Sequence, residues 1–266
     1  MTLEEHKMLA LMTKGRNEYG ILAVKAEFEA EGTRTDELLR LLDIARRAGL
    51  KVAIKIGGCE AIRDLIECRQ FGADYIIAPM VETPYALKKY IEAKNKCYSA
   101  QEQKDVNFLF NVETHSTTGY LEELGVRAQE GGVGMVFGRV DFAGSMGKDR
   151  SIINTPEMSD HVIKVAEVAR QRNFDLVVGG AVSPEGISAL RSIRETKLDR
   201  FETRKVIFDG AVLDGNNAAD GIECAMEFEL LWLQNKRNYY QTIASEDATR
   251  IAMMEARQAG KSKSGN

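Results

Sequence analysis

The sequence predicts an α/β fold, specifically a (β/α)8 TIM barrel with extra C-terminal helices. The length of 266 residues is close to the ~250 residues typical of an eight-stranded barrel. Short apolar runs that read as buried strands alternate with amphipathic helical patterns, as repeated βα units require. Seven runs are clear and end near residues 25, 56, 79, 113, 139, 180 and 208. We expect the eighth strand around Leu198–Phe201 or near the N-terminus.

The composition indicates a globular protein and argues against several classes of partner. Hydrophobic residues make up 44% of the chain, and the formal charge of −4 disfavours a nucleic-acid binder, whose surface would carry a basic patch. No apolar run reaches the ~18 residues of a membrane span, and the N-terminus does not resemble a signal peptide. The four cysteines follow no CxxC or zinc pattern, so we expect reduced thiols in a cytoplasmic protein.

The first strand continues into charged residues. An amphipathic helix over residues 2–18 precedes the apolar run Gly20–Val24, which leads directly into Lys25, and Glu27 follows two residues later. Alternate residues of a strand share one face, so both side chains would point the same way at the barrel mouth. Charges there are costly unless they pair or bind a ligand, which makes both residues candidates for the site. The alternative is a strand end that frays into water.

The second strand contains another candidate. Thr35–Ala48 reads as a capped helix that ends at Gly49, and the strand Val52–Ile56 follows. Lys55 lies in this strand beside two glycines, which allow a ligand to approach the backbone closely. Its ammonium could bind a substrate carboxylate. A lysine that extends along apolar surface to solvent would give the same pattern.

The third repeat leads to the centre of the chain. A helix over Cys59–Phe71 precedes the strand Asp74–Ala78, which stops at Pro79 because proline cannot donate to a sheet. Thr83–Lys96 is the next helical pattern, and the lysines of its last turn suit the negative end of a helix dipole.

The central stretch reads as a strand, a helix and a strand. The runs Phe108–Val112 and Val133–Phe137 are short and rich in aromatic and β-branched residues, and Ser116–Gln129 between them has apolar residues at helical spacing. A carboxylate follows each run, first Glu113 and then Asp141. Parallel strands of a βαβ unit emerge at the same end of a barrel, so the two carboxylates should lie side by side at the mouth.

Two converging carboxylates suit a hard divalent cation such as Mg²⁺ or Mn²⁺. Water and an oxygen-rich substrate would complete its coordination. The alternative is that Glu113 and Asp141 are surface charges that happen to follow strands. The sequence thus predicts a metal site with these two residues as ligands and leaves the surface alternative open.

The glycines after the central unit do not form a nucleotide-binding motif. A long loop, Phe142–Pro156, contains Gly147-Lys148, but Asp149 stands where a P-loop has Ser or Thr. A helix over Ser159–Arg172 and a strand at Asp175–Val178 follow this loop. Lys205–Phe208 is the last clear strand of the predicted barrel.

The C-terminal part changes in character. Ala218–Leu233 and Glu246–Gln258 are helical patterns with a large apolar load, and only one such face can easily cover the barrel. We therefore expect the other helix to be swapped or packed between subunits of a homo-oligomer. A single domain would then cover residues 1–266, with a core at about 20–214, a helical extension at 215–259 and a polar, disordered tail at 260–266.

Three segments resemble the aldolase/citrate lyase family, that is, the HpcH/HpaI aldolases of the pyruvate- and phosphoenolpyruvate-binding TIM barrels. The most specific are NVET at residues 111–114 and GRVDFAGSMG at 138–147, which are similar to the two metal-ligand segments of the family. APMVET at 78–83 resembles a strand end of the family. The likeness extends over roughly Gly20 to Phe208.

The resemblance implies a lyase that depends on Mg²⁺ or Mn²⁺, with Glu113 and Asp141 as ligands. It implies cleavage of a 4-hydroxy-2-oxo acid, or the reverse addition of a pyruvate enolate to an aldehyde that could be sugar-derived. The cation and backbone amides near Gly138 and Ala143 would stabilise the enolate. The expected partner is a small 2-oxo acid.

The chain also departs from the family at the expected substrate and base positions. Lys55 stands where the family usually has an arginine that binds the substrate carboxylate. The family's histidine base is missing after the first strand, where Lys25 or Glu27 could replace it, and His115 is a further candidate. Arg139 could bind a substrate carboxylate or phosphate.

Two other functions fit the same pattern. A Schiff-base aldolase would use Lys25 or Lys55 as a nucleophile, because a desolvated lysine can lose its proton near neutral pH. A non-catalytic barrel would bind a 2-oxo acid without turning it over. The missing histidine favours this last reading, whereas the Glu113 and Asp141 pair disfavours it.

Overall fold

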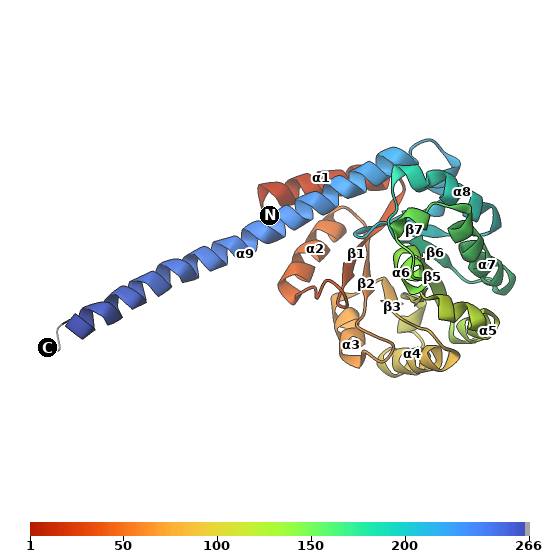
Figure 1. Ribbon diagram of the computed structural model, residues 1–266, viewed down its shortest axis with the longest axis horizontal. Helices are drawn as coiled ribbons and strands as arrows, with labels where there is room; N and C mark the ends of the chain where they lie inside the picture. Colours follow the sequence, from red (N-terminus) through yellow and green to blue (C-terminus); the bar gives the residue numbers. More distant parts are fainter. Residues whose placement is uncertain (264–266) are drawn as a thin grey trace.

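The computed structural model describes residues 1–263, with side chains described through residue 259. Eight strands form a closed barrel in sequence order, surrounded by helices (Figure 1). The strands are β1 Ile21–Glu27, β2 Lys51–Lys55, β3 Tyr75–Ala78, β4 Asn107–Val112, β5 Gly134–Gly138, β6 Leu176–Gly179, β7 Arg200–Glu202 and β8 Val206–Asp209. The predicted fold class, an eight-stranded α/β barrel with a helical C-terminal extension, is confirmed.

The last strand runs against the others. β1 to β7 pair in parallel, whereas β8 pairs antiparallel with both β7 and β1. Only three residues, 203–205, connect β7 to β8, and a parallel pair would need a crossover of a dozen residues or more. The prediction of eight βα repeats is therefore wrong in its last repeat. β8 begins at the mouth, where the other strands end, and the predicted strand around Leu198–Phe201 is β7.

The helices cover the outside of the barrel. They are α1 Leu3–Glu18, α2 Thr35–Arg47, α3 Ile62–Phe71, α4 Pro84–Cys97, α5 Leu121–Gly131, α6 Arg139–Ser145, α7 Pro156–Arg172, α8 Ile187–Thr196 and α9 Ala218–Lys263. Short 3-10 helices lie at Glu102–Lys104, His115–Tyr120, Arg150–Ile152, Pro184–Gly186 and Gly210–Asp214. Local signals fix several ends: Thr2 and Glu5 form a capping box on α1, and Gly72 and Gly132 end α3 and α5 in the left-handed conformation.

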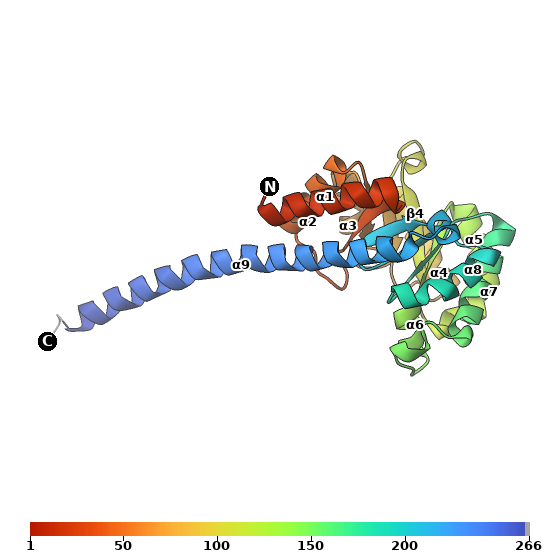
Figure 2. The same cartoon turned by 90° about the horizontal axis from the view of Figure 1, so that it is seen from above.

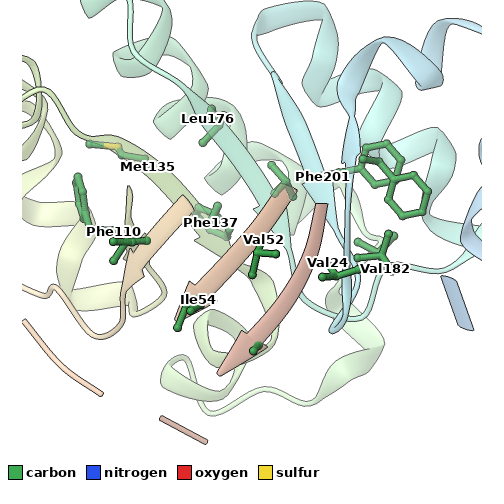
Figure 3. Close-up of a cluster of buried hydrophobic side chains, with 14 of the residues drawn as sticks. Val24, Val52, Ile54, Phe110, Met135, Phe137, Leu176, Val182 and Phe201 are labelled. Atoms are coloured by element: carbon green, nitrogen blue, oxygen red, sulfur yellow. The ribbon is translucent and has the colours of Figure 1, made fainter. Parts of the chain in front are cut away.

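The core has two parts. The larger part lies between strands and helices and includes Val24, Val52, Phe110 and Phe201 (Figure 3). The smaller part fills the barrel interior with one layer of side chains: Ala23, Ala53, Tyr75, Ile77, Leu109, Val136, Val177 and Ile207. Because strand side chains alternate, residues two positions further along the parallel strands also point inward, above this layer. Those positions form the floor of the mouth.

The C-terminal extension is one helix where the sequence suggested two. α9 has 46 residues, which corresponds to about 69 Å at 1.5 Å per residue. Its first half packs beside α1, and the rest projects away from the barrel (Figures 1 and 2). It continues through residues 260–263 of the predicted tail, and residues 264–266 lie outside the described part. None of the described helices, α9 included, is long and apolar enough to cross a membrane.

Candidate active site

Buried charges occupy the carboxyl end of the barrel interior. Lys25 and Glu27 from β1, Lys55 from β2, Asn111 and Glu113 at the end of β4, and Glu202 from β7 are all less than a tenth exposed. Each lies on a strand, or directly after one, at a position that points inward. The alternation of β1 thus brings Lys25 and Glu27 inside, as the sequence predicted, and the frayed-end alternative is wrong for both.

Glu113 is held by three neighbours. Its Oε1 accepts a hydrogen bond from the amide of Met80 at 2.7 Å, and its Oε2 accepts one from Asn111 Nδ2 at 2.5 Å. The ammonium of Lys55 lies 3.6 Å from the same Oε2. Burial raises the pKa of Glu113, the charge of Lys55 opposes this, and the charge of Asp141 adds to the rise. Glu113 is therefore a buried carboxylate, and the alternative of a surface charge is wrong for this residue.

Asp141 follows the neighbouring strand, β5. β5 ends at Gly138, α6 begins at the next residue, and Asp141 lies exposed in the first turn of this helix. A Cβ on Gly138 would lie 3.0 Å from the Cβ of Glu113, so glycine lets the two strand ends approach closely. The side chain of Asp141 thus borders the site from the solvent side, where its charge acts on Glu113.

The donor set at Glu113 is compatible with a hard cation. Beside it, the Oδ1 of Asn111 is buried and has no hydrogen-bond partner among the residues that the structure describes. A buried oxygen without a partner marks a place for a ligand or water. Among the side chains described, residues 1–259, no three His, Cys, Asp or Glu cluster so that they could hold a metal ion. Glu113 and Asp141 would therefore leave most coordination positions to water and substrate.

Lys25 lies between two carboxylates. Its Nζ is 2.5 Å from Oε1 of Glu202 and 3.5 Å from Oε1 of Glu27. Burial disfavours the ammonium, but the attraction of Glu202 and Glu27 outweighs burial and raises the pKa of Lys25. The second oxygen of Glu202, Oε2, is buried without a hydrogen-bond partner among the described residues. Lys25 therefore stays charged near an unused carboxylate oxygen.

Lys55 has a similar environment. Its Nζ is 2.8 Å from Oε2 of Glu29 and 3.6 Å from Oε2 of Glu113. Burial opposes its charge, but the carboxylates of Glu113, Glu29 and Glu27 together raise its pKa. The alternative of an ammonium that reaches out to solvent does not match this buried, paired position.

Arg139 has protein partners for its donors. The side chain is fully buried, Nε donates to the carbonyl of Gly179 at 3.0 Å, and Nη2 donates to the carbonyl of Gly180 at 2.8 Å. Nη1 donates to Oδ1 of Asn154 at 3.4 Å. Burial lowers the pKa of Arg139 to about 10. The guanidinium joins the ends of β5 and β6, and its binding of a substrate anion stays a prediction.

The other predicted residues lie around the mouth. Gly138 is half-buried beside Glu113, whereas Ala143 lies in the second turn of α6, where helical bonding uses its amide. His115 is exposed and its ring lies 6.0 Å from that of Phe142 and 5.7 Å from that of His161. The histidine thus packs at the surface against His161 and the buried Phe142.

The sequence analysis missed three participants. Glu202 is the last residue of β7, much as Glu113 is the first residue after β4. A search for carboxylates at strand ends would therefore have found Glu202 if the segment RFE had been recognised as a strand. Asn111 lies two residues before Glu113, on the same face of β4. Lys205 directly precedes β8 and pairs with Glu31, but only the reversed strand direction brings it to the mouth.

The chain matches known proteins along most of its length. The sequence model of HpcH/HpaI aldolase/citrate lyase matches residues 28–191. The structure is similar to an HpcH/Hpal aldolase/citrate lyase family protein from Burkholderia cenocepacia J2315, with a TM-score of 0.61, 15% identity, and coverage of 91% of this chain and 92% of that one. An HpcH/HpaI aldolase from Desulfitobacterium hafniense DCB-2 has a TM-score of 0.59 at 12% identity, with coverage of 79% and 85%. No curated protein matches by sequence.

The buried pair of Lys25 and Glu202 leads to a stability prediction. Glu202→Ala should lower the free energy of unfolding by about 3 kcal/mol, because it removes a partner of a buried ammonium. Glu123→Ala is the control, since it removes the exposed pair of Glu123 with Arg127 and should cost less than about 1 kcal/mol. Urea unfolding measures both changes. Equal effects of the two substitutions would show that the Lys25 pair does not stabilise the barrel.

Proposed function

Because the chain belongs to the HpcH/HpaI aldolase/citrate lyase family and is a carbon–carbon lyase, we propose that it cleaves or forms 4-hydroxy-2-oxo acids with a divalent cation. The observation that carries the proposal is the buried carboxylate of Glu113, beside the unsatisfied oxygen of Asn111 and within the electrostatic reach of Asp141. Glu113 and Asp141 would hold Mg²⁺ or Mn²⁺. The bound cation would stabilise negative charge as it develops on the 2-oxo group.

The lysines have a binding role in this proposal. Lys55 would bind the substrate carboxylate, because its ammonium already lies among carboxylate oxygens and is kept charged by them. It provides a point charge, so it would orient the substrate less strictly than the two parallel hydrogen bonds of an arginine. The backbone amide near Gly138 would donate a hydrogen bond to the developing enolate, whereas the amide of Ala143 is already used within α6.

The carboxylate of Glu27 would transfer the proton. In the cleavage direction Glu27 would accept the proton of the C4 hydroxyl, the C3–C4 bond would break to give the aldehyde, and the electron pair would leave as the pyruvate enolate. A proton returned to C3 would complete pyruvate. The ammonium of Lys25, whose pKa the neighbouring carboxylates raise, lies 3.5 Å from Oε1 of Glu27 and would position that carboxylate.

The proposed function also bears on the substrate, the oligomeric state and the location of the protein. We propose a small 2-oxo acid as the substrate, with an aldehyde partner that could be sugar-derived, and a homo-oligomer as the working form. All four cysteines are unpaired thiols. This favours a reducing compartment, and thus a cytoplasmic location.

The site favours the metal-dependent route over the Schiff-base alternative. A Schiff base requires a neutral amine, and the carboxylates around Lys25 and Lys55 raise the pKa of both lysines. The missing histidine base favours a barrel that only binds, but other groups of the site could replace it. Glu27, Glu202 and Glu113 provide carboxylates that could move a proton.

Release of pyruvate tests the proposed function. Chelator-stripped protein should cleave a 4-hydroxy-2-oxo acid only after Mg²⁺ or Mn²⁺ is added, and Glu113→Gln should lower kcat/KM by about 100-fold or more, because it removes an anionic ligand. Glu82→Gln is the control, since Glu82 is an exposed carboxylate near the mouth. Full activity in the presence of chelator would contradict the proposal.

Reductive trapping tests the lysines separately. At neutral pH both ammonium groups should stay protonated, because each titrates above its ordinary range and the neutral amine appears only as the pH rises further. Borohydride added with pyruvate should therefore give no covalent adduct by intact-protein mass spectrometry. An adduct that disappears in Lys25→Met or Lys55→Met would make the Schiff-base mechanism the better account.

A further inference from the structure

The outer half of α9 projects beyond the barrel of its own chain (Figures 1 and 2). Tyr240 donates a hydrogen bond to Glu37 of α2 at 2.6 Å, and Lys236 pairs with the same carboxylate at 3.1 Å. From residue 244 to residue 259 every side chain is exposed, and the helix projects from the barrel (Figures 1 and 2). We call residues 244–257 of this segment the arm. Isolated helices of this length are marginal in water, so the arm should have a packing partner.

One face of α9 between residues 226 and 258 is mostly apolar. Its positions recur at alternating steps of four and three, the spacing of a coiled-coil seam. Met226, Leu230, Leu233, Ile251 and Met254 on this face are between 47% and 56% exposed. We call the complete seam the α9 stripe: Met226, Leu230, Leu233, Arg237, Tyr240, Ala244, Asp247, Ile251, Met254 and Gln258.

The α9 stripe is complementary to itself in reverse. When two copies run antiparallel about a twofold axis at residue 242, Leu233 of each copy faces Ile251 of the other, and Leu230 faces Met254. The same register places the large Tyr240 opposite the small Ala244. Apolar side chains thus meet apolar ones, and volumes alternate across the seam.

The charges of the α9 stripe select this direction. In the antiparallel register Arg237 of one copy faces Asp247 of the other, twice per dimer. A parallel pair would place Arg237 against Arg237 and Asp247 against Asp247, which is costly inside an interface. Neither residue has an ion-pair partner among the residues that the structure describes. The charged residues that flank the α9 stripe include both signs, so they favour no particular register. The residues of the stripe itself therefore determine the register.

We propose that α9 is a dimerisation helix that pairs antiparallel with α9 of a second copy, centred on residue 242. Each arm then covers the exposed Met226, Leu230 and Leu233 beside the partner's barrel, which explains why the helix extends so far beyond its own barrel. The overlap of residues 226–258 is about 50 Å long and about one helix wide on each copy. It buries on the order of 1,000 Å², the size at which specific interfaces begin.

Charge reversal in the full-length chain tests the proposal. Sedimentation equilibrium should give twice the chain mass of 29.6 kDa for the wild type. Arg237→Asp and Asp247→Arg should each raise the dimer Kd by about 100-fold, because each places like charges face to face. The double variant, with both reversals, should dimerise like the wild type. A monomeric wild type, or single variants that associate normally, would overturn the proposal.

Disulfide formation tests the direction independently of other contacts between barrels. The double variant Leu233→Cys/Ile251→Cys should form an intermolecular disulfide under mild oxidation, whereas each single variant should not. In a parallel pair each introduced cysteine would face the same cysteine of the other copy, so each single variant would form the disulfide. The wild type, with its four native cysteines, sets the background, and circular dichroism checks that α9 remains helical.

Discussion

Pairing of opposite charges inside the barrel is the interaction on which the rest of the site depends. Lys25 and Lys55 lie where solvent is scarce, and each is compensated by carboxylates from other strands or from the loop after β1. A single buried ion would cost several kcal/mol, so these contacts must form together. The contact of Lys25 with Glu202 also joins the first and seventh strands across the mouth, so that pairing contributes to barrel closure as well as to the chemistry.

The reversed last strand follows from a short connection. Three residues between β7 and β8 permit a hairpin but no crossover helix, and the closing strand therefore descends from the mouth. This direction places Lys205 beside the site and lets β8 close the barrel against β1. Glycines at 138 and 179 allow the side chains of Glu113 and Glu202 to lie against the strand backbone.

The sequence was informative wherever a local period carried the information. Alternation on β1 placed Lys25 and Glu27 inside the barrel, and the βαβ pattern placed Glu113 at its mouth. The sequence was less informative about which side chains contact each other. Nothing local shows that Arg139 bonds to two carbonyls of β6 or that Glu202 meets Lys25, since those contacts are 40 and 177 residues apart in sequence. The two C-terminal helical patterns are one helix because no proline or glycine interrupts residues 234–245 between them.

Binding of Mn²⁺ by chelator-stripped protein, followed by electron paramagnetic resonance, tests the central claim most directly. The protein should bind one Mn²⁺ per chain, oxalate as a pyruvate enolate mimic should tighten binding and perturb the spectrum, and Asp141→Asn should weaken it by about 10-fold or more. This measurement needs no knowledge of the aldehyde. Free-ion spectra at all protein concentrations, or binding that Asp141→Asn leaves unchanged, would contradict the account of Glu113 and Asp141 as a metal site.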